Sequence, residues 1–152
     1  MKNNSKFKIQ NSKLIKGFTL IELLIVIAII GVLAALLMAN FVGVRQRGRD
    51  AQRKSDLRQI QSALELYRAD ESSYPAALPA CGTALTGSVS SNVYVQKLPC
   101  DPITGVTYSY TPSGTPPMSY ELIACLENVN DSQKDSANTC GTNGWSLTLL
   151  NP

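Results

Sequence analysis

The sequence predicts an α+β protein in which one long N-terminal α-helix packs on a small antiparallel β-sheet head. Two observations carry this prediction. An apolar run near the N-terminus continues, without a proline, into a segment of helical periodicity that reaches about Ser72. Beyond Tyr74-Pro75 the composition changes to Gly, Pro, Ser, Thr and Asn, with short β-prone runs between them. At 152 residues the chain suits one compact domain plus one further segment.

The first 17 residues differ in charge from the rest of the chain. They contain no acidic residue and five lysines, namely Lys2, Lys6, Lys8, Lys13 and Lys16. The remainder has nine basic and eleven acidic residues, so the net charge of +3 comes from the N-terminal segment. The basic balance therefore does not indicate nucleic-acid binding by the rest of the chain.

The apolar run forms the first half of the predicted helix. From Leu23 to Ala39, 17 residues carry no charge. As a helix they span about 26 Å, just enough to cross the hydrocarbon core of a membrane. A single acid, Glu22, stands at the start of this run, where an ionised group is costly unless it is paired.

The second half of the predicted helix is amphipathic. Its apolar residues recur at spacings of three and four and share one face: Leu57, Ile60, Leu64 and Tyr67. Its charged residues are expected largely on other faces: Arg53, Lys54, Arg58, Glu65 and Arg68. We interpret the basic run 45–58 as a solvated or subunit-facing surface, with phospholipid headgroups or DNA as the alternative contacts. Proline at positions 75 and 79 ends the helix, which is predicted from about Phe18 to about Ser72.

The remaining chain predicts a sheet of three or four antiparallel strands over the apolar helix face. The candidate strands are Val93–Gln96, Val106–Tyr110, Tyr120–Cys125 and Trp145–Leu149. Turns are expected at Asp101–Gly105 and Pro112–Gly114. The tyrosines of this region are expected to pack on the helix instead of forming an adhesive surface: Tyr94, Tyr108, Tyr110 and Tyr120.

The composition restricts the chemistry of the chain. Histidine is absent, which excludes His-dependent triads and His-ligated metals. Four cysteines follow the apolar run and none has CxxC spacing: Cys81, Cys100, Cys125 and Cys140. An even number outside the cytosol predicts two disulfides, with four free buried thiols as the alternative. Of the three pairings we favour Cys81–Cys100 and Cys125–Cys140.

The segment Lys16-Gly17-Phe18-Thr19-Leu20-Ile21-Glu22-Leu23-Leu24-Ile25-Val26 resembles the class III leader of type IV pilins and of type II secretion pseudopilins. The resemblance implies that a prepilin peptidase cuts between Gly17 and Phe18 and that Phe18 becomes N-methylated. It also implies that Glu22 meets the new N-terminal amine of a neighbouring subunit and so sets the register of a filament. The residues alone allow another partner, the amine of the same helix at i, i+4.

Three other interpretations of the N-terminus compete with this one. One of them treats Gly17 and Glu22 as incidental, which the joint pattern disfavours; the other two assign the segment a different role. An ordinary signal peptide would be cut near Leu37-Met38-Ala39. A plain single-pass anchor would keep residues 1–17. Neither gives a reason for an acid at Glu22 or for the amphipathic continuation of the helix. A further stretch, Leu98-Pro99-Cys100-Asp101-Pro102 with Gly105 and Tyr108-Ser109-Tyr110, is similar to the loop-and-strand region of major pseudopilins.

Together these observations predict four segments. Residues 1–17 are a leader, 18–44 the membrane-spanning and filament-core half of the helix, 45–74 its amphipathic half, and 75–152 a disulfide-stapled β-rich head. The resemblance implies a structural subunit, not an enzyme, of a type IV pilus or a type II secretion pseudopilus, serving adhesion, motility, DNA uptake or protein export. The alternative is a membrane-tethered or secreted monomeric surface-binding module.

The resemblance also implies partners and a location. The partners are sister subunits in a homo-oligomeric filament, the prepilin peptidase, an inner-membrane assembly platform and membrane lipid before assembly; nucleic acid is not expected as a direct main partner. The chain would be a single-pass membrane protein with an extracytoplasmic head, and later part of a periplasmic or cell-surface filament.

Calcium is the one cofactor that the sequence suggests. Major pseudopilins often bind it near the C-terminus, and oxygen-bearing side chains gather there in this chain: Glu127, Asn128, Asn130, Asp131 and Asp135. The spacing is not that of an EF-hand, and loops rich in Asn and Asp are usually turns. We therefore expect no cofactor, with calcium as the weaker alternative, and assign no metal ligand and no catalytic residue.

Overall fold

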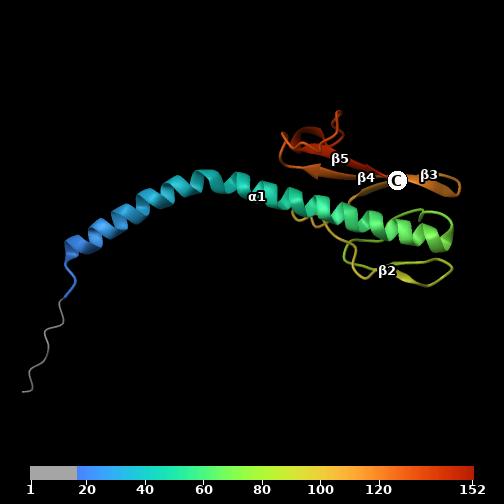
Figure 1. Ribbon diagram of the computed structural model, residues 1–152, viewed down its shortest axis with the longest axis horizontal. Coiled ribbons are helices and arrows are strands. Elements are labelled where there is room, and N and C mark those ends of the chain that lie inside the picture. Colours follow the sequence, from blue (N-terminus) through green and yellow to red (C-terminus); the bar gives the residue numbers. More distant parts are fainter. Residues whose placement is uncertain (1–16) are drawn as a thin grey trace, which may run out of the picture. The chain divides into compact units, whose positions relative to one another are not determined.

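A computed structural model describes residues 17–152 and confirms the predicted α+β fold class (Figure 1). One helix precedes five short or medium strands and a 3₁₀ turn: α1 Leu20–Glu71, β1 Leu85–Thr86, β2 Val93–Val95, β3 Ser109–Gly114, β4 Pro117–Leu126, η1 Gly141–Asn143 and β5 Trp145–Leu150. The chain divides into a unit that ends at Asn40 and a unit from Phe41 to Pro152, and each is described by itself. Most of the predicted leader, residues 1–16, lies outside the described residues.

In the unit that ends at Asn40, α1 presents apolar side chains on every side. The stretch Leu20–Met38 contains 19 residues, and none of it is buried within the chain. At 1.5 Å per residue it is about 28 Å long, close to the thickness of a hydrocarbon core. By length and composition, this stretch can cross a membrane.

The helix ends at defined local structures. Its last residue is Glu71, one before the predicted end, because Ser72 adopts a left-handed φ of 62°. The Ser72 N–H bonds to the Arg68 carbonyl at 2.8 Å, which satisfies one of the last helical acceptors. Pro75 then keeps the chain out of the helical conformation.

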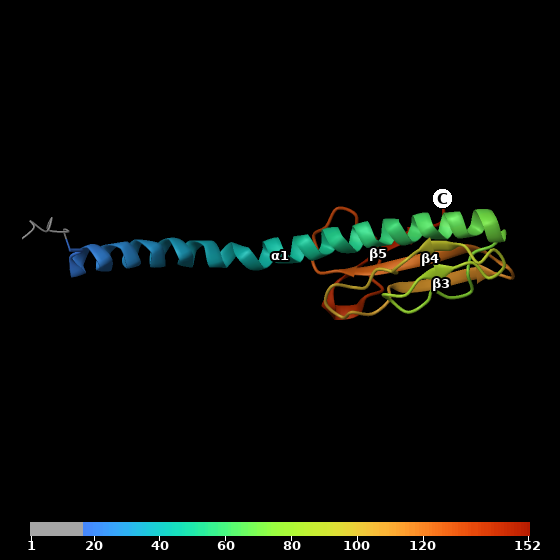
Figure 2. The same cartoon turned by 90° about the horizontal axis from the view of Figure 1, so that it is seen from below.

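In the unit from Phe41 to Pro152, the helix lies along one face of an antiparallel sheet with strand order β3-β4-β5 (Figure 2). The predicted apolar stripe of the helix is confirmed, since Leu57, Ile60 and Leu64 are fully buried and Tyr67 is almost so. The central strand β4 supplies the facing layer with alternate residues: Tyr120, Leu122, Ala124 and Leu126. The period of two in β4 and the spacing of three and four in α1 therefore meet in one core.

A second, two-stranded sheet pairs β1 with β2, with Leu85 opposite Val95. The ring of Tyr94 in β2 lies 5.3 Å from that of Tyr67 in the helix, a favourable aromatic separation. The predicted packing of the tyrosines is confirmed, because Tyr108 and Tyr120 are buried and the other two are half-buried against the core. Strand β1 was not predicted, since two residues carry no periodicity.

Strand β3 corrects two of the sequence predictions. It begins at Ser109 instead of Val106, because the Val106 carbonyl accepts the Asp101 N–H at 3.0 Å and so belongs to the preceding turn. It also runs through the predicted turn, since Pro112 pairs with Tyr120 and the chain reverses only after Gly114. Proline is tolerated there because β3 is an edge strand of this sheet. Edge strands accommodate the missing N–H of proline, since their outer side has no neighbouring strand to bond.

Two disulfides join Cys81 to Cys100 and Cys125 to Cys140, the pairing favoured above. Their sequence separations are 19 and 15 residues. In the chain-entropy picture, a loop of this size contributes about 3 kcal/mol of stability. The second bond links the end of β4 to the segment just before β5, so it closes the C-terminal loop of the head.

Candidate assembly site

The start of α1 contains a hydrogen-bonded capping box. The Thr19 N–H donates to Glu22 Oε2 at 2.9 Å, and the Thr19 hydroxyl donates to the same oxygen at 2.8 Å. In return the Glu22 N–H donates to Thr19 Oγ1 at 3.3 Å. These bonds satisfy donors that the first turn leaves without a helical partner, so the helix begins at Leu20 and not at Phe18.

This capping box was missed in the sequence analysis, although its signal is present. Threonine followed three residues later by glutamate, directly before an apolar run, is the usual pattern for such a helix start. The structure therefore gives Glu22 a local role in addition to the predicted pairing with an amine. Only the pairing with an amine would neutralise the carboxylate. Thr19 donates hydrogen bonds to Glu22 but leaves its negative charge uncompensated.

The negative charge of Glu22 lies in apolar surroundings. Its helical neighbours are exposed apolar side chains, among them Leu20, Ile21, Leu23 and Ile25. Within residues 17–152, no cation lies within ion-pair distance of Glu22, and all five ion pairs belong to the unit from Phe41 onward. A carboxylate in such a position needs a positive partner when lipid or protein surrounds it, and none of residues 17–152 supplies one.

The predicted cleavage site, Gly17-Phe18, precedes the helix and is exposed. Phe18 is 80% exposed. A side chain added at Gly17 meets no atom within 4 Å, and its φ lies outside the left-handed region. Among residues 17–152, neither packing nor backbone conformation therefore requires glycine at position 17. This is the result expected if a processing enzyme, and not the fold, requires the residue; the roles of Gly17, Phe18 and Glu22 stay predictions.

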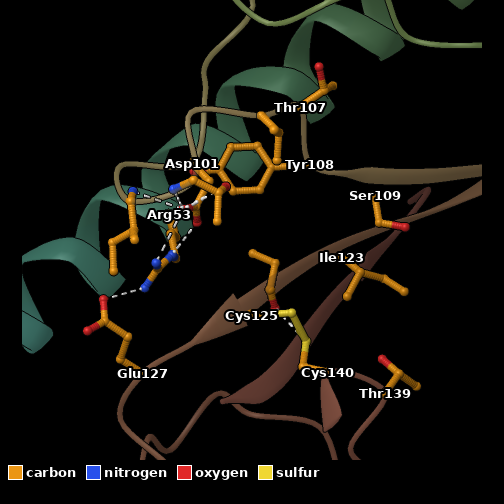
Figure 3. A pocket seen from close by; sticks show the side chains of 14 residues that line it. Arg53, Asp101, Thr107, Tyr108, Ser109, Ile123, Cys125, Glu127, Thr139 and Cys140 are labelled. Atoms are coloured by element: carbon orange, nitrogen blue, oxygen red, sulfur yellow. Dashed lines mark hydrogen bonds and ion pairs between the residues drawn. A yellow bond between two sulfur atoms is a disulfide. The ribbon is translucent and has the colours of Figure 1, made fainter. Parts of the chain in front are cut away.

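A cluster of ion pairs fastens the head to the helix (Figure 3). Arg53 is only 3% exposed, and its guanidinium donates to Asp101 at 2.6 Å, to Glu127 at 2.8 Å and to Asp50 at 2.9 Å. Asp50 is buried too and accepts the backbone N–H groups of Glu127 and Asn128 at 2.9 and 2.8 Å. The prediction that Arg53 lies on a solvated or subunit-facing surface was wrong, because three carboxylates surround it: Asp50 of the helix and Asp101 and Glu127 of the head.

The cluster orders the two loops that contain Asp101 and Glu127 and lowers the pKa values of these two carboxyl groups. Asp101 also accepts the backbone N–H groups of Ile103 and Thr104, each at 2.9 Å, so it shapes the predicted turn at 101–105. Burial opposes its ionisation, but the hydrogen bonds from Arg53 and from these N–H groups lower the pKa of Asp101 to about 2. The hydrogen bond from Arg49 lowers the pKa of Glu127. Burial alone would lower the pKa of Arg53, but its three carboxylates raise it.

A cavity of about 680 Å³ opens beside this cluster (Figure 3). Arg53, Asp101 and Glu127 are among the residues that line it, and so are the disulfide-bonded Cys125 and Cys140. The charged groups there are already paired with one another, and the remaining lining is mostly apolar or hydroxyl-bearing. The Thr104 hydroxyl donates to the Asp101 carboxylate at 3.2 Å, and both residues line the cavity. Asp101 also accepts hydrogen bonds from Arg53 and from two backbone N–H groups, and its lowered pKa makes it a poor general base at neutral pH.

Comparison with known sequences identifies the family. Residues 12–38 match the prokaryotic N-terminal methylation motif, and residues 40–140 match type II secretion system protein G. The chain belongs to the type II secretion system protein G family. The resemblance to pseudopilins is thereby confirmed, and so is the prediction that the chain is not an enzyme, because protein G is a structural pseudopilin.

Several relatives carry the name type II secretion system core protein G. The Escherichia coli (strain K12) relative is 34% identical over 95 residues, which are 57% of this chain and 66% of the relative. The Pectobacterium carotovorum relative is 32% identical over 95 residues, 57% of this chain and 61% of the relative. The Pseudomonas aeruginosa relative is 35% identical over 107 residues, 65% of this chain and 75% of the relative. The chain thus spans slightly less than two thirds of the first two relatives. No solved structure matches it significantly.

Proposed function

We propose that this chain is the major pseudopilin of a type II secretion system, a filament subunit that supports protein export. One observation carries the proposal: Glu22 is a single carboxylate without a cation partner in the described chain, at the start of an apolar helix exposed on every side. Membership of the protein G family supports the pseudopilus over the adhesive pilus.

The charge of Glu22 gives processing a physical purpose. Cleavage between Gly17 and Phe18 creates an α-amino group whose usual pKa is near 8, so it is mostly positive at neutral pH. A positive group at a helix N-terminus is unfavourable by itself, because the helix dipole is positive there. Pairing with a carboxylate removes both penalties. A retained leader would block this amine in an amide bond.

Filament growth needs such a pair because lipid offers apolar helices little reason to associate. Moving Leu or Ile from lipid to a helix bundle gains almost no hydrophobic free energy, so packing and polar contacts decide association. One pair of charges in an apolar seam is stable at one register only, since any axial slip leaves both charges unpaired. In this proposal Glu22 therefore fixes the axial offset between successive subunits.

The capping box favours an amine from a neighbouring subunit over the subunit's own. Both hydrogen bonds from Thr19 go to Glu22 Oε2, whereas Oε1 accepts none from the described residues. Phe18 and Thr19 also lie outside the helix, so the regular i, i+4 geometry does not extend to Phe18. Oε1 can thus receive a neighbour's ammonium group while Oε2 continues to cap the helix.

The proposed partners follow from this mechanism. Before assembly, Leu20–Met38 spans the inner membrane and the head is periplasmic. A prepilin peptidase removes the leader and methylates Phe18, and an assembly platform then moves the subunit into the pseudopilus. Sister copies are the main partners, and lipid is the partner of the unassembled pool.

Replacing Glu22 tests the proposal. In cells that also produce the peptidase and the assembly platform, we expect Glu22→Gln to leave membrane insertion and leader removal intact. Sheared-filament yield should fall at least about tenfold, since a tenfold loss needs only about 1.4 kcal/mol per subunit added. Glu121→Gln is the matched control, because Glu121 is an exposed carboxylate of the head.

The outcomes separate the candidate functions. Normal filaments from Glu22→Gln would overturn the proposed pairing. Normal display of wild-type heads without any filament, in cells with the complete machinery, would favour the monomeric surface-binding module instead. Loss of filaments with an uncut precursor would place the defect in processing and would also contradict the proposed role of Glu22.

A further inference from the structure

The loop between β4 and β5 contains the oxygen-bearing residues that suggested calcium binding from the sequence. A calcium ion takes six to eight oxygen ligands at 2.3–2.6 Å. A carboxylate oxygen that already accepts hydrogen bonds from the protein must give them up before it can bind the ion. Among residues 17–152, no group of three or more acidic or cysteine side chains is placed to share a metal ion.

Asp131, at the centre of the loop, is held by a lysine from the helix. Lys54 Nζ lies 2.6 Å from both carboxylate oxygens of Asp131. The Gln133 N–H adds a bond of 2.9 Å to one of the same oxygens. Both side chains are largely shielded, with 20% of Lys54 and 15% of Asp131 exposed. The ammonium group thus stands where a metal ion bound to this carboxylate would stand.

The other carboxylates of the loop are used as well. Glu127 accepts two bonds from Arg49, at 2.6 and 2.5 Å, and one from Arg53. Asp135 accepts the Thr148 N–H at 3.0 Å and the Thr148 hydroxyl at 2.7 Å. Glu127 and Asp131 are therefore directed toward different residues of α1, and Asp135 is directed toward β5, so the three carboxylates do not converge on one point.

A second lysine engages the backbone of the loop. Lys134 Nζ donates to the Val129 carbonyl at 2.6 Å, the kind of oxygen that calcium loops often use. The same ammonium group lies 4.2 Å from the centre of the Trp145 ring, a cation–π contact. Lys54 and Lys134 therefore bring positive charge to the loop from two directions.

We propose that the loop 127–135 is closed by the ammonium groups of Lys54 and Lys134 and takes no calcium. A lysine 2.6 Å from both oxygens of Asp131 and a divalent ion on the same oxygens exclude each other by space and by charge. Binding of calcium would require Lys54 to leave and the carboxylates to turn away from Arg49 and Thr148. The proposal does not depend on filament assembly and is tested on unassembled protein.

The first test uses the wild-type full-length protein in detergent with its disulfides intact. Trypsin cuts after Lys134 inside the loop and after Lys97 outside it, and mass spectrometry after reduction gives both rates. We expect the ratio of the two rates to be equal in EGTA and in millimolar calcium chloride. Protection of Lys134 by calcium, or saturable calcium binding by calorimetry, would overturn the proposal.

The second test removes the lysine. In EGTA, Lys54→Gln is expected to raise the rate of tryptic cleavage after Lys134, relative to cleavage after Lys97, about fivefold. A factor of this size corresponds to a modest loss of local stability. Asp131→Asn, which breaks the same pair from the other side, should give a similar increase. Arg58→Gln is the matched control, an exposed cation one turn along the same helix. Equal ratios in Lys54→Gln and Arg58→Gln would refute the lysine closure.

Discussion

Replacing the buried guanidinium of Arg53 should be among the most damaging single changes in the head. Arg53→Met keeps the aliphatic part of the side chain but leaves Asp101 without its cation and removes one donor from Glu127 and Asp50. Breaking a buried pair by removing one partner costs about 3–5 kcal/mol. The lower end applies here, because Asp101 and Glu127 are 13% and 16% exposed and keep other donors.

The expected loss is thus about 3 kcal/mol of unfolding free energy, or about 6–12 °C in Tm for a chain of this size. Thermal unfolding of the full-length protein in detergent, followed by far-UV circular dichroism, measures it. Arg58→Met is the control and should change stability by no more than about 0.5 kcal/mol, since Arg58 is exposed. If both variants unfold at the same temperature, the ion-pair cluster does not fasten the head to the helix.

Two further predictions concern the same head. The carboxyls of Asp101 and Glu127 have lowered pKa values in the fold, so their stabilisation is complete above about pH 5, where both are ionised even in the unfolded chain, and is lost as the pH falls toward 2. The Tm measured from pH 6 to pH 2.5 should therefore fall, and Asp101→Asn should flatten this fall. A Tm that rises on acidification would contradict the assignment. Leu64→Ala should cost about 3 kcal/mol in urea unfolding because Leu64 is fully buried, and Leu66→Ala, at a position 58% exposed, should cost less than about 0.5 kcal/mol; similar losses for both would show that the helix face is assigned wrongly.

The helix and its buried face were predictable because their evidence is local. Spacings of three and four at Leu57, Ile60, Leu64 and Tyr67 reflect one helical period, and burial confirmed all four. The strand predicted at 120–125 was found for the same reason, since the alternation from Tyr120 to Ala124 is a local pattern. The Thr19–Glu22 cap was equally local and was missed although its sequence signal is clear.

The burial of Arg53 was not predictable in this way. Its partners Asp101 and Glu127 lie 48 and 74 residues further along the chain, and only the folded head brings them to the helix. In sequence, Arg53 resembles its neighbours in the basic run. The same holds for Lys54, whose partner Asp131 is 77 residues away. Long-range electrostatic pairing decides which charges of an amphipathic helix are solvated, and helical period alone does not reveal it.

A mass spectrum of the mature N-terminus, taken on protein from cells that contain the peptidase, tests the proposed pathway most directly. A chain that begins at Phe18 and carries one extra methyl group on its amine is the predicted result. A chain that still begins at Met1, or one that begins near Asn40, would remove the amine that Glu22 is proposed to meet, and the assembly mechanism with it.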